Sequence, residues 1–467
     1  MKVHVSKPLF AWECLQDSPS LKTIRLFLES VPDAALLRSL RDARGKGRND
    51  YPVEVLWGTL LLTIALRHPH FENTLAELRR NPPLASLIGI QNEEQVPDAH
   101  NLSRFLEKLG QAPHRDHLQG VFDTMVSRLG QAVPDFGKHT AGDATALQAR
   151  RDKRTKDIDA TAETRDAHGL PIATGGRKEY TDDQGHVTQV VEWFGYKVHL
   201  LVDVKHEVIL AWQMTSPKTT DNEMIEPLVE QAAANLPAGR IETLAYDKAA
   251  DDGKVHALLH EHGITPVIEL RSQWQNQREK LVPGQERRGN IVYTEEGTVL
   301  CINTKGRPGE QLDPDHKPVP IRQPMAYAGH EKSRGTLKYR CPARHQGWEC
   351  PMSSYCNQGK NYGLTVRVKR EIDLRRFPPV PRSTKKFEEL YKGRTAVERV
   401  NARLKLFWGA DDGNITGSAR FFAFVGTIMV VHAAFATLLA KAPRYEGRLG
   451  QTKLSPIAKH LTDLITA

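Results

Sequence analysis

The chain has 467 residues, which is long enough for two or three domains. Hydrophobic residues make up 39% of it and charged residues 26%, which fits a globular protein able to bury a core. The net charge of +9 favours a polyanionic partner. The opening residues, MKVHVSKPLF, contain no long apolar core, so we expect no secretory signal peptide and a cytoplasmic protein.

The first 135 residues have a helical pattern. Residues 51–68, YPVEVLWGTLLLTIALRH, carry a broad apolar face, and a shorter helical run follows them. After an Asn-Pro-Pro breaker, a further helix begins near Asp98 and ends at Gly110. We expect a helical N-terminal domain over residues 1–135. It could bind DNA or mediate dimerisation, but a plain helical packing domain fits the same residues.

From about residue 138 strands and helices alternate. HTAGDATALQA predicts a strand, and two further apolar strands that turn at Lys205-His206 predict a hairpin. DNEMIEPLVEQAAANLP is an amphipathic helix, and it is followed by a strand, IETLAYDKAA, a helix, DDGKVHALLHEHG, and a strand, TPVIEL. Three strands and then helix, strand, helix, strand is an α/β order. We expect residues 136–272 to form the first part of an α/β core.

Residues 273–362 lose this periodicity and are rich in Pro, Gly, Arg and Gln, which predicts an insertion. After it, LTVRVKREIDL predicts a strand that leads back to the core. Four of the five cysteines lie in the insertion; the five are Cys14, Cys301, Cys341, Cys350 and Cys356. The segment CPARHQGWECPMSSYC offers a possible structural zinc site made of Cys341, His345, Cys350 and Cys356. The spacing lacks paired C-x2-C motifs, so unligated reduced thiols are the alternative, and disulfides are not expected in the cytoplasm.

Residues 385–409, KKFEELYKGRTAVERVNARLKLFWG, predict one long helix with a weak point at Gly393. On a continuous helix, four polar residues of this segment fall on a stripe about 60° wide. They are Tyr391, Arg394, Glu398 and Lys405. A solvated helix face is the ordinary interpretation of such a stripe. A tyrosine, one carboxylate and two cations on one face also fit a site that handles phosphate groups.

The spacing Y-x2-R-x3-E-x6-K resembles the signature of the bacterial insertion-sequence transposases of the DDE group. This resemblance covers roughly residues 138–440. It implies a ribonuclease H-like fold in which the first and fourth strands are neighbours. It also implies that Glu398 is the third metal-binding carboxylate, whereas Tyr391, Arg394 and Lys405 contact the DNA of the transposon ends.

The other two carboxylates that the resemblance requires are Asp143, in TAGDATAL, and Asp247, in TLAYDKAA. An Asp within a strand pattern is disfavoured by propensity, which makes both positions notable. Three converging carboxylates need a cation, and hard oxygen ligands suit two Mg²⁺ or Mn²⁺ ions. Many family members follow the second Asp with Gly-Tyr, whereas here Asp247 precedes Lys248-Ala249. The competing carboxylates have structural interpretations, a hairpin end or a helix start; they are Asp203, Asp251 and Asp252.

Residues 149–157, ARRDKRTKD, form a basic stretch soon after Asp143. We expect its cations to contact DNA phosphates near the active site, with a solvated loop as the alternative. These cations include Arg150, Arg151, Lys153 and Arg154.

Residues 421–440, FFAFVGTIMVVHAAFATLLA, are long and apolar enough to span a bilayer. Because His432 interrupts the run, we expect a buried core helix with His432 as a satisfied core histidine, and no membrane span. This helix would complete the second part of the core, residues 363–445, which a C-terminal tail over 446–467 follows.

Together these features predict a DDE transposase that cleaves double-stranded DNA at the element ends and transfers the strands to a target, as a homodimer on DNA. Its catalytic carboxylates would be Asp143, Asp247 and Glu398. Two alternatives remain open at this point. One is a metal-dependent nuclease without strand transfer, and the other is a non-catalytic, zinc-stabilised DNA-binding regulator.

Overall fold

The structure is a computed structural model. It describes residues 19–46, 50–151, 161–162, 164–182, 184, 186–271, 274, 279–305, 320–357, 361–442, 445–451, 453, 457 and 459. The chain divides into two compact units. Unit 1 is formed by Met1–Arg240 and Thr395–Ala467, and unit 2 by Ile241–Arg394.

The N-terminal part of unit 1 is helical, as the sequence predicts. Its helices are α1 (Pro19–Ser30), α2 (Ala34–Arg44), α3 (Val53–Ala65), α4 (Phe71–Arg80), α5 (Pro82–Ser86), α6 (Ala99–Leu109) and α7 (His114–Ala132). In α3 every residue except Glu54 is buried, which explains why this segment is apolar around most of its circumference. The predicted division of the chain into five domains stays a prediction.

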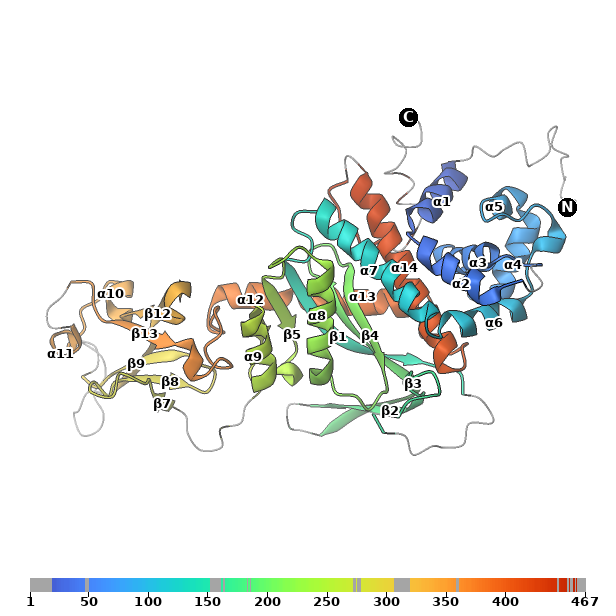
Figure 1. Ribbon diagram of the computed structural model, residues 1–467. Coiled ribbons are helices and arrows are strands. Elements are labelled where there is room, and N and C mark those ends of the chain that lie inside the picture. Colours follow the sequence, from blue (N-terminus) through green and yellow to red (C-terminus); the bar gives the residue numbers. More distant parts are fainter. Residues whose placement is uncertain are drawn as a thin grey trace, which may run out of the picture. The chain divides into compact units, whose positions relative to one another are not determined.

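One helix of the described residues, α14 (Ser418–Lys441), is long and apolar enough to cross a membrane. It packs against α7, α6, α1 and α3, and 83% of its most apolar window is buried (Figure 1). His432 is fully buried, and its Nε2 accepts a hydrogen bond of 3.2 Å from the backbone N–H of Ile209. The prediction of a buried core helix is therefore confirmed. The histidine is satisfied only at Nε2, because its buried Nδ1 has no hydrogen-bond partner in the described part of the chain.

An antiparallel sheet forms the second half of unit 1. Its strands are β1 (His139–Gln148), β2 (Thr174–Thr181), β3 (Val187–Asp203) and β4 (Ile209–Thr215). The long β3 pairs with β2 along its first half, whereas β1 and β4 both pair with its second half. The predicted hairpin is the β3–β4 pair, and α8 (Ile225–Asn235) packs against both strands. The strand β2 was not predicted.

The helix that carries Glu398 lies on this sheet. α13 (Thr395–Leu406) contacts both β1 and β3 (Figure 1). Its buried side chains include Val397, Val400 and Leu404, which recur at helical spacing and give the helix an apolar face.

Unit 2 begins with two parallel strands, β5 (Thr243–Tyr246) and β6 (Thr265–Ile268). The connection between them holds α9 (Gly253–Glu261), so the segment is the strand–helix–strand unit that the sequence predicts. A later helix, α12 (Lys385–Lys392), packs against both strands.

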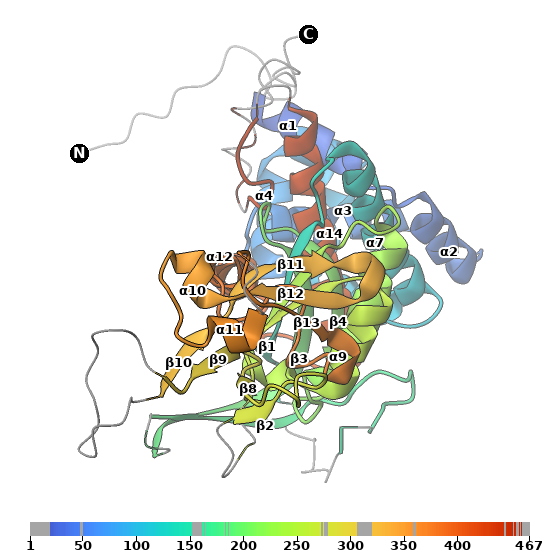
Figure 2. The same cartoon turned by 90° about the vertical axis from the view of Figure 1, so that its left-hand side faces the viewer.

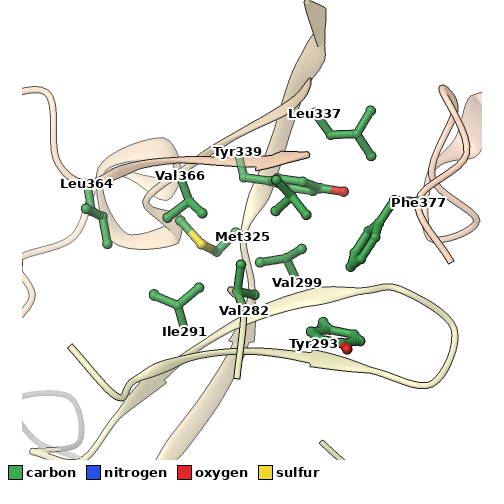
Figure 3. Packing of buried hydrophobic residues seen from close by; sticks show 11 residues of the cluster. Val282, Ile291, Tyr293, Val299, Met325, Leu337, Tyr339, Leu364, Val366 and Phe377 are labelled. Atoms are coloured by element: carbon green, nitrogen blue, oxygen red, sulfur yellow. The ribbon is translucent and has the colours of Figure 1, made fainter. Parts of the chain in front are cut away.

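The insertion contains two small antiparallel sheets. One consists of β7 (Glu279–Leu281), β8 (Ile291–Thr294), β9 (Val299–Asn303) and β10 (Ile321–Pro324). The other consists of β11 (Ala326–Glu331), β12 (Thr336–Arg340) and β13 (Thr365–Lys369) (Figure 2). Side chains from both sheets point into one apolar layer, where Tyr293, Tyr339 and Phe377 lie with smaller aliphatic residues (Figure 3). The strand predicted at LTVRVKREIDL is β13. It does not join the core as predicted but pairs with β12, so this sheet extends past residue 362, the predicted end of the insertion.

The prediction of one long helix over residues 385–409 is wrong. α12 ends at Lys392 and α13 begins at Thr395. At the break, the N–H of Gly393 bonds to the carbonyl of Leu390 at 3.0 Å, and the N–H of Arg394 bonds to that of Tyr391 at 2.9 Å. These i to i−3 bonds tighten the last turn and end the helix at its glycine.

Candidate active site

Asp143 lies in the middle of β1, opposite Leu200 of β3, and its side chain is partly buried. Asn401 of α13 donates a hydrogen bond of 3.0 Å from Nδ2 to Asp143 Oδ2. Asn401 is 8% exposed, and its Oδ1 is buried without a hydrogen-bond partner in the described part of the chain. Asn401, which contacts Asp143, therefore has a buried acceptor atom without a donor among the described residues. This Oδ1 could accept a hydrogen bond from a water bound to a cation.

Glu398 is exposed and lies in the first turn of α13. It precedes Asn401 by three residues, which is about 4.5 Å along the helix axis and about 60° around it. Unit 1 thus holds Asp143 against α13, the helix that also carries Glu398.

α13 is held to the β3–β4 turn by a buried carboxylate that the sequence did not reveal. Glu207 is fully buried and has a φ of 56°. Its carboxylate pairs with Arg399 at 2.6 Å and also with Arg403 and Arg448. Two of these arginines are on α13, so the ion pairs fix the helix that carries Glu398.

Lys405, the last residue of the signature, lies near the end of α13. Its Nζ is 3.4 Å from Asp411 Oδ2, and Asp411 Oδ1 accepts a hydrogen bond of 2.6 Å from the backbone N–H of Gln148. Gln148 is the last residue of β1. Lys405 and Glu398 are seven residues apart on one continuous helix, which keeps both on one face.

Asp247 belongs to unit 2, where it directly follows β5. It is partly buried, and its Oδ1 accepts from the backbone N–H of Ala249 at 3.0 Å. Within the same unit, burial and then the charge of Glu269 raise the pKa of Tyr391, and Asp247 adds a smaller effect. Arg394 lies over the Tyr391 ring at 5.9 Å. Unit 2 therefore gathers Asp247 with the first two residues of the signature, and its relation to Asp143 stays a prediction.

The competing carboxylates have structural roles. Asp203 ends β3, is 1% exposed, and accepts from the backbone N–H groups of Gly137 and His206. Asp252 caps α9 by accepting from the N–H of Lys254 at 2.7 Å. These two follow the predicted hairpin-end and helix-start roles.

Asp251 does not cap the helix, and its carboxylate lies in a network of unit 2 instead. Its Oδ2 is 2.6 Å from Arg375, and its Oδ1 is 3.0 Å from His256. Burial opposes its ionisation, but hydrogen bonds from His256 and Arg375 outweigh it and lower its pKa to about 2. The Asp251 carboxylate is thus already bonded to arginine, histidine and backbone partners, which gives it a structural role.

Two of the predicted basic DNA contacts can be placed. Arg150 and Arg151 are exposed directly after β1, and Arg151 lies over the Phe194 ring at 4.9 Å. Arg150 borders a cavity of about 540 Å³ that Arg67, Phe407 and other residues of unit 1 also line. Lys153 and Arg154 lie outside the described residues.

The predicted zinc set does not come together as a whole. Among the described residues, no group of three or more His, Cys, Asp or Glu side chains is already arranged to hold a metal ion. Cys341, Cys350 and Cys356 line one small cavity, whereas His345 is exposed and is not part of its lining.

Two family models match the chain. Residues 136–433 match the transposase DDE domain family, and residues 13–108 match a second transposase domain family (DUF772). No curated protein matches the chain. The first match covers more than half of the chain and includes Asp143, Asp247 and Glu398. The chain therefore belongs to the transposase DDE domain family and is an insertion-sequence transposase, an enzyme that acts on DNA.

Proposed function

We propose that Asp143, Asp247 and Glu398 are the catalytic carboxylates of this transposase. The observation that carries the proposal is the contact between Asn401 and Asp143, because it ties the helix of Glu398 to the strand of Asp143. The family implies dependence on a divalent metal. Carboxylate oxygens and the free acceptor of Asn401 fit hydrated Mg²⁺ or Mn²⁺, and they do not suit a soft metal.

Two such ions, when bound, would activate a water and stabilise the leaving 3′ oxygen. The protein's own part is to hold its carboxylates in place. Asn401 holds the Asp143 carboxylate in place by donating a hydrogen bond to its Oδ2. Glu398 is exposed on α13, where a ligand in solvent can reach its carboxylate. The same site can align a 3′-hydroxyl against a second phosphodiester, which gives strand transfer.

The cations of the site would position the DNA backbone. Lys405 pairs with Asp411 near the end of β1, next to exposed Arg150 and Arg151, and these side chains can contact phosphates. Tyr391 and Arg394 would contact the transposon end from unit 2, and Lys153 and Arg154 would extend the basic stretch. We also propose a homodimer on double-stranded DNA and a cytoplasmic location.

The test is cleavage and strand transfer with the element's own ends, with and without Mg²⁺. Asp143→Asn, Asp247→Asn and Glu398→Gln should each abolish cleavage while DNA binding persists, because only the ionised carboxylates hold the metal. Asp252→Asn, at a helix cap, is the matched control and should keep cleavage. A Glu398→Gln variant that cleaves like the wild type would overturn the assignment. Cleavage without strand transfer by the wild type would instead indicate a nuclease.

A further inference from the structure

Four cysteine side chains of unit 2 line one small cavity. They come from three places in the insertion. Cys301 is on β9, and Cys341 directly precedes α10 (Pro342–Gln346). Cys350 lies three residues before α11 (Ser353–Asn357), and Cys356 lies within it. The cavity has a volume of about 30 Å³, close to the space of one water molecule. Leu364, which Figure 3 shows at one end of the apolar layer, and Met325, nearer its middle, also line the cavity. A single ion, rather than an organic ligand, matches this size.

The surroundings of the four thiols suit sulfur ligands of a metal. Asn290 is 5% exposed, and its Nδ2 lies 3.4 Å from Cys356 Sγ and 3.9 Å from Cys301 Sγ. An N–H group that points at a sulfur ligand holds that sulfur in position toward a metal. The Asn290 side chain therefore joins a sulfur of β9 to a sulfur of α11.

Backbone hydrogen bonds also anchor two of these cysteines to neighbouring segments. Cys341 donates its N–H to the carbonyl of Leu364 at 2.8 Å, and a Cβ added to Gly363 would lie 2.9 Å from the Cys341 Cβ. Gly363 has a φ of 74°, so glycine serves both the turn and this close approach. On the other side, Cys356 donates its N–H to the carbonyl of Met352 at 3.0 Å.

The donor atoms select the metal. All four cysteines are free thiols, and four sulfur donors favour zinc over a hard cation such as Mg²⁺. Cys301 takes the place that the sequence pattern gave to His345. His345 is exposed and lines a separate, open cavity together with Cys341 and Cys356.

We propose that Cys301, Cys341, Cys350 and Cys356 bind one structural Zn²⁺. The four thiols surround the cavity without yet forming a coordination set in the described residues, so binding draws them inward by rotation about their Cα–Cβ bonds. The ion would fasten α10 and α11 to β9. Since α11 contributes few buried side chains, the metal would supply stability that the apolar layer does not. This site is independent of the proposed catalytic carboxylates.

The first measurement uses the full-length wild-type chain, purified without a metal-affinity step. Elemental analysis should give close to one zinc per chain. Zinc X-ray absorption should then show four sulfur ligands near 2.3 Å, as in tetrathiolate sites. Absence of zinc, even after Zn²⁺ is added to the reduced protein, would overturn the proposal. A shell of three sulfurs and one nitrogen at about 2.0–2.1 Å would overturn it in favour of His345.

Variants separate the two ligand sets. Cys301→Ser should lose most of the zinc, whereas His345→Ala, the matched control, should retain it. Glu398→Gln should also keep its zinc, so that loss of cleavage and loss of zinc are distinguishable. Because Cys301→Ser could fail to fold, the wild type provides a second readout: a chelator should remove the zinc and lower the unfolding temperature. Zinc retained by Cys301→Ser, or lost by His345→Ala, would contradict the assignment.

Discussion

Replacing Glu207 by Gln tests how the helix of Glu398 is held. The substitution keeps the size of the side chain and removes the negative charge that three arginines share. Glu207 is fully buried, whereas the side chains of Arg403, Arg399 and Arg448 are 19%, 42% and 57% exposed. The three arginines should therefore respond differently to its loss.

The expected cost follows from these exposures. Removing one partner of a buried ion pair costs about 3–5 kcal/mol, because the other charge stays buried without a counter-charge. Arg399 and Arg448 can turn to water, so their pairs contribute little. Arg403 cannot, and the amide oxygen of Gln still accepts one hydrogen bond. We therefore expect a loss of about 3 kcal/mol, at the low end of the range.

The assay is urea unfolding of the full chain, monitored through the loss of helix content by circular dichroism. The loss should lower the midpoint of unfolding, and thermal unfolding should shift down by roughly 3–5 °C. Glu226→Gln, at an exposed position of α8, is the control and should stay within about 0.5 kcal/mol of the wild type. Adding Arg403→Met to Glu207→Gln should recover part of the lost stability, because the double variant no longer buries an unpaired guanidinium charge.

Two results would refute this reasoning. One is a Glu207→Gln variant as stable as the wild type. The other is a larger cost for Arg448→Ala than for Arg403→Ala, because that order would contradict the argument from exposure.

Two further predictions concern single buried side chains. Asn401→Ala should lower the cleavage rate roughly 10- to 100-fold and raise the Mg²⁺ concentration required, because Asp143 loses the hydrogen bond from Asn401. The control, Ala402→Ser on the same helix, should cleave normally. An unchanged Mg²⁺ titration of Asn401→Ala would contradict this role of Asn401. Burial lowers the pKa of His432 to about 3 from its ordinary 6.5, so between these values the unfolded chain binds more protons and stability must decrease as pH falls. His432→Gln should flatten the decrease in unfolding free energy between about pH 7 and pH 5, and equal slopes in the two proteins would show that His432 does not cause it.

The elements that the sequence predicts well are those with strong local patterns. The β3–β4 hairpin and α14 carry long apolar runs, and α9 has a clear start at Asp252. Such patterns depend on neighbours in the chain, so a single sequence contains them. The break after α12 was missed because the surrounding residues are good helix formers, and one glycine is a weak signal against them.

The sheets of the insertion were missed for another reason. Their strands are three to six residues long, and β7 and β10 have no buried residue. Their stability comes from an apolar layer assembled from distant segments, as Tyr293 and Tyr339 illustrate. Cys301 was left out of the predicted zinc set for the same reason, since it lies 40 residues before Cys341.

The candidate site could be predicted only in part. Asp143 and Glu398 stand out because a carboxylate is unusual within a strand and the signature spacing is specific. Asn401 lies close to the helix face of Glu398 and Lys405, which the sequence pattern shows. Its role comes from the hydrogen bond to Asp143, which a sequence pattern does not show. Glu207 gives no local signal, because its partners are more than 190 residues away.

The side chains of α13 form three faces around the helix: a face toward the candidate site, a face of ion pairs and an apolar face. Relative to Glu398, Asn401 and Lys405 fall within about 60°, whereas Arg399 and Arg403 lie about 100–140° away. The apolar residues occupy the remaining side. Apolar packing is non-directional and would tolerate some rotation of the helix. The ion pairs with Glu207 fix that rotation and so set the direction in which the face with Glu398, Asn401 and Lys405 points.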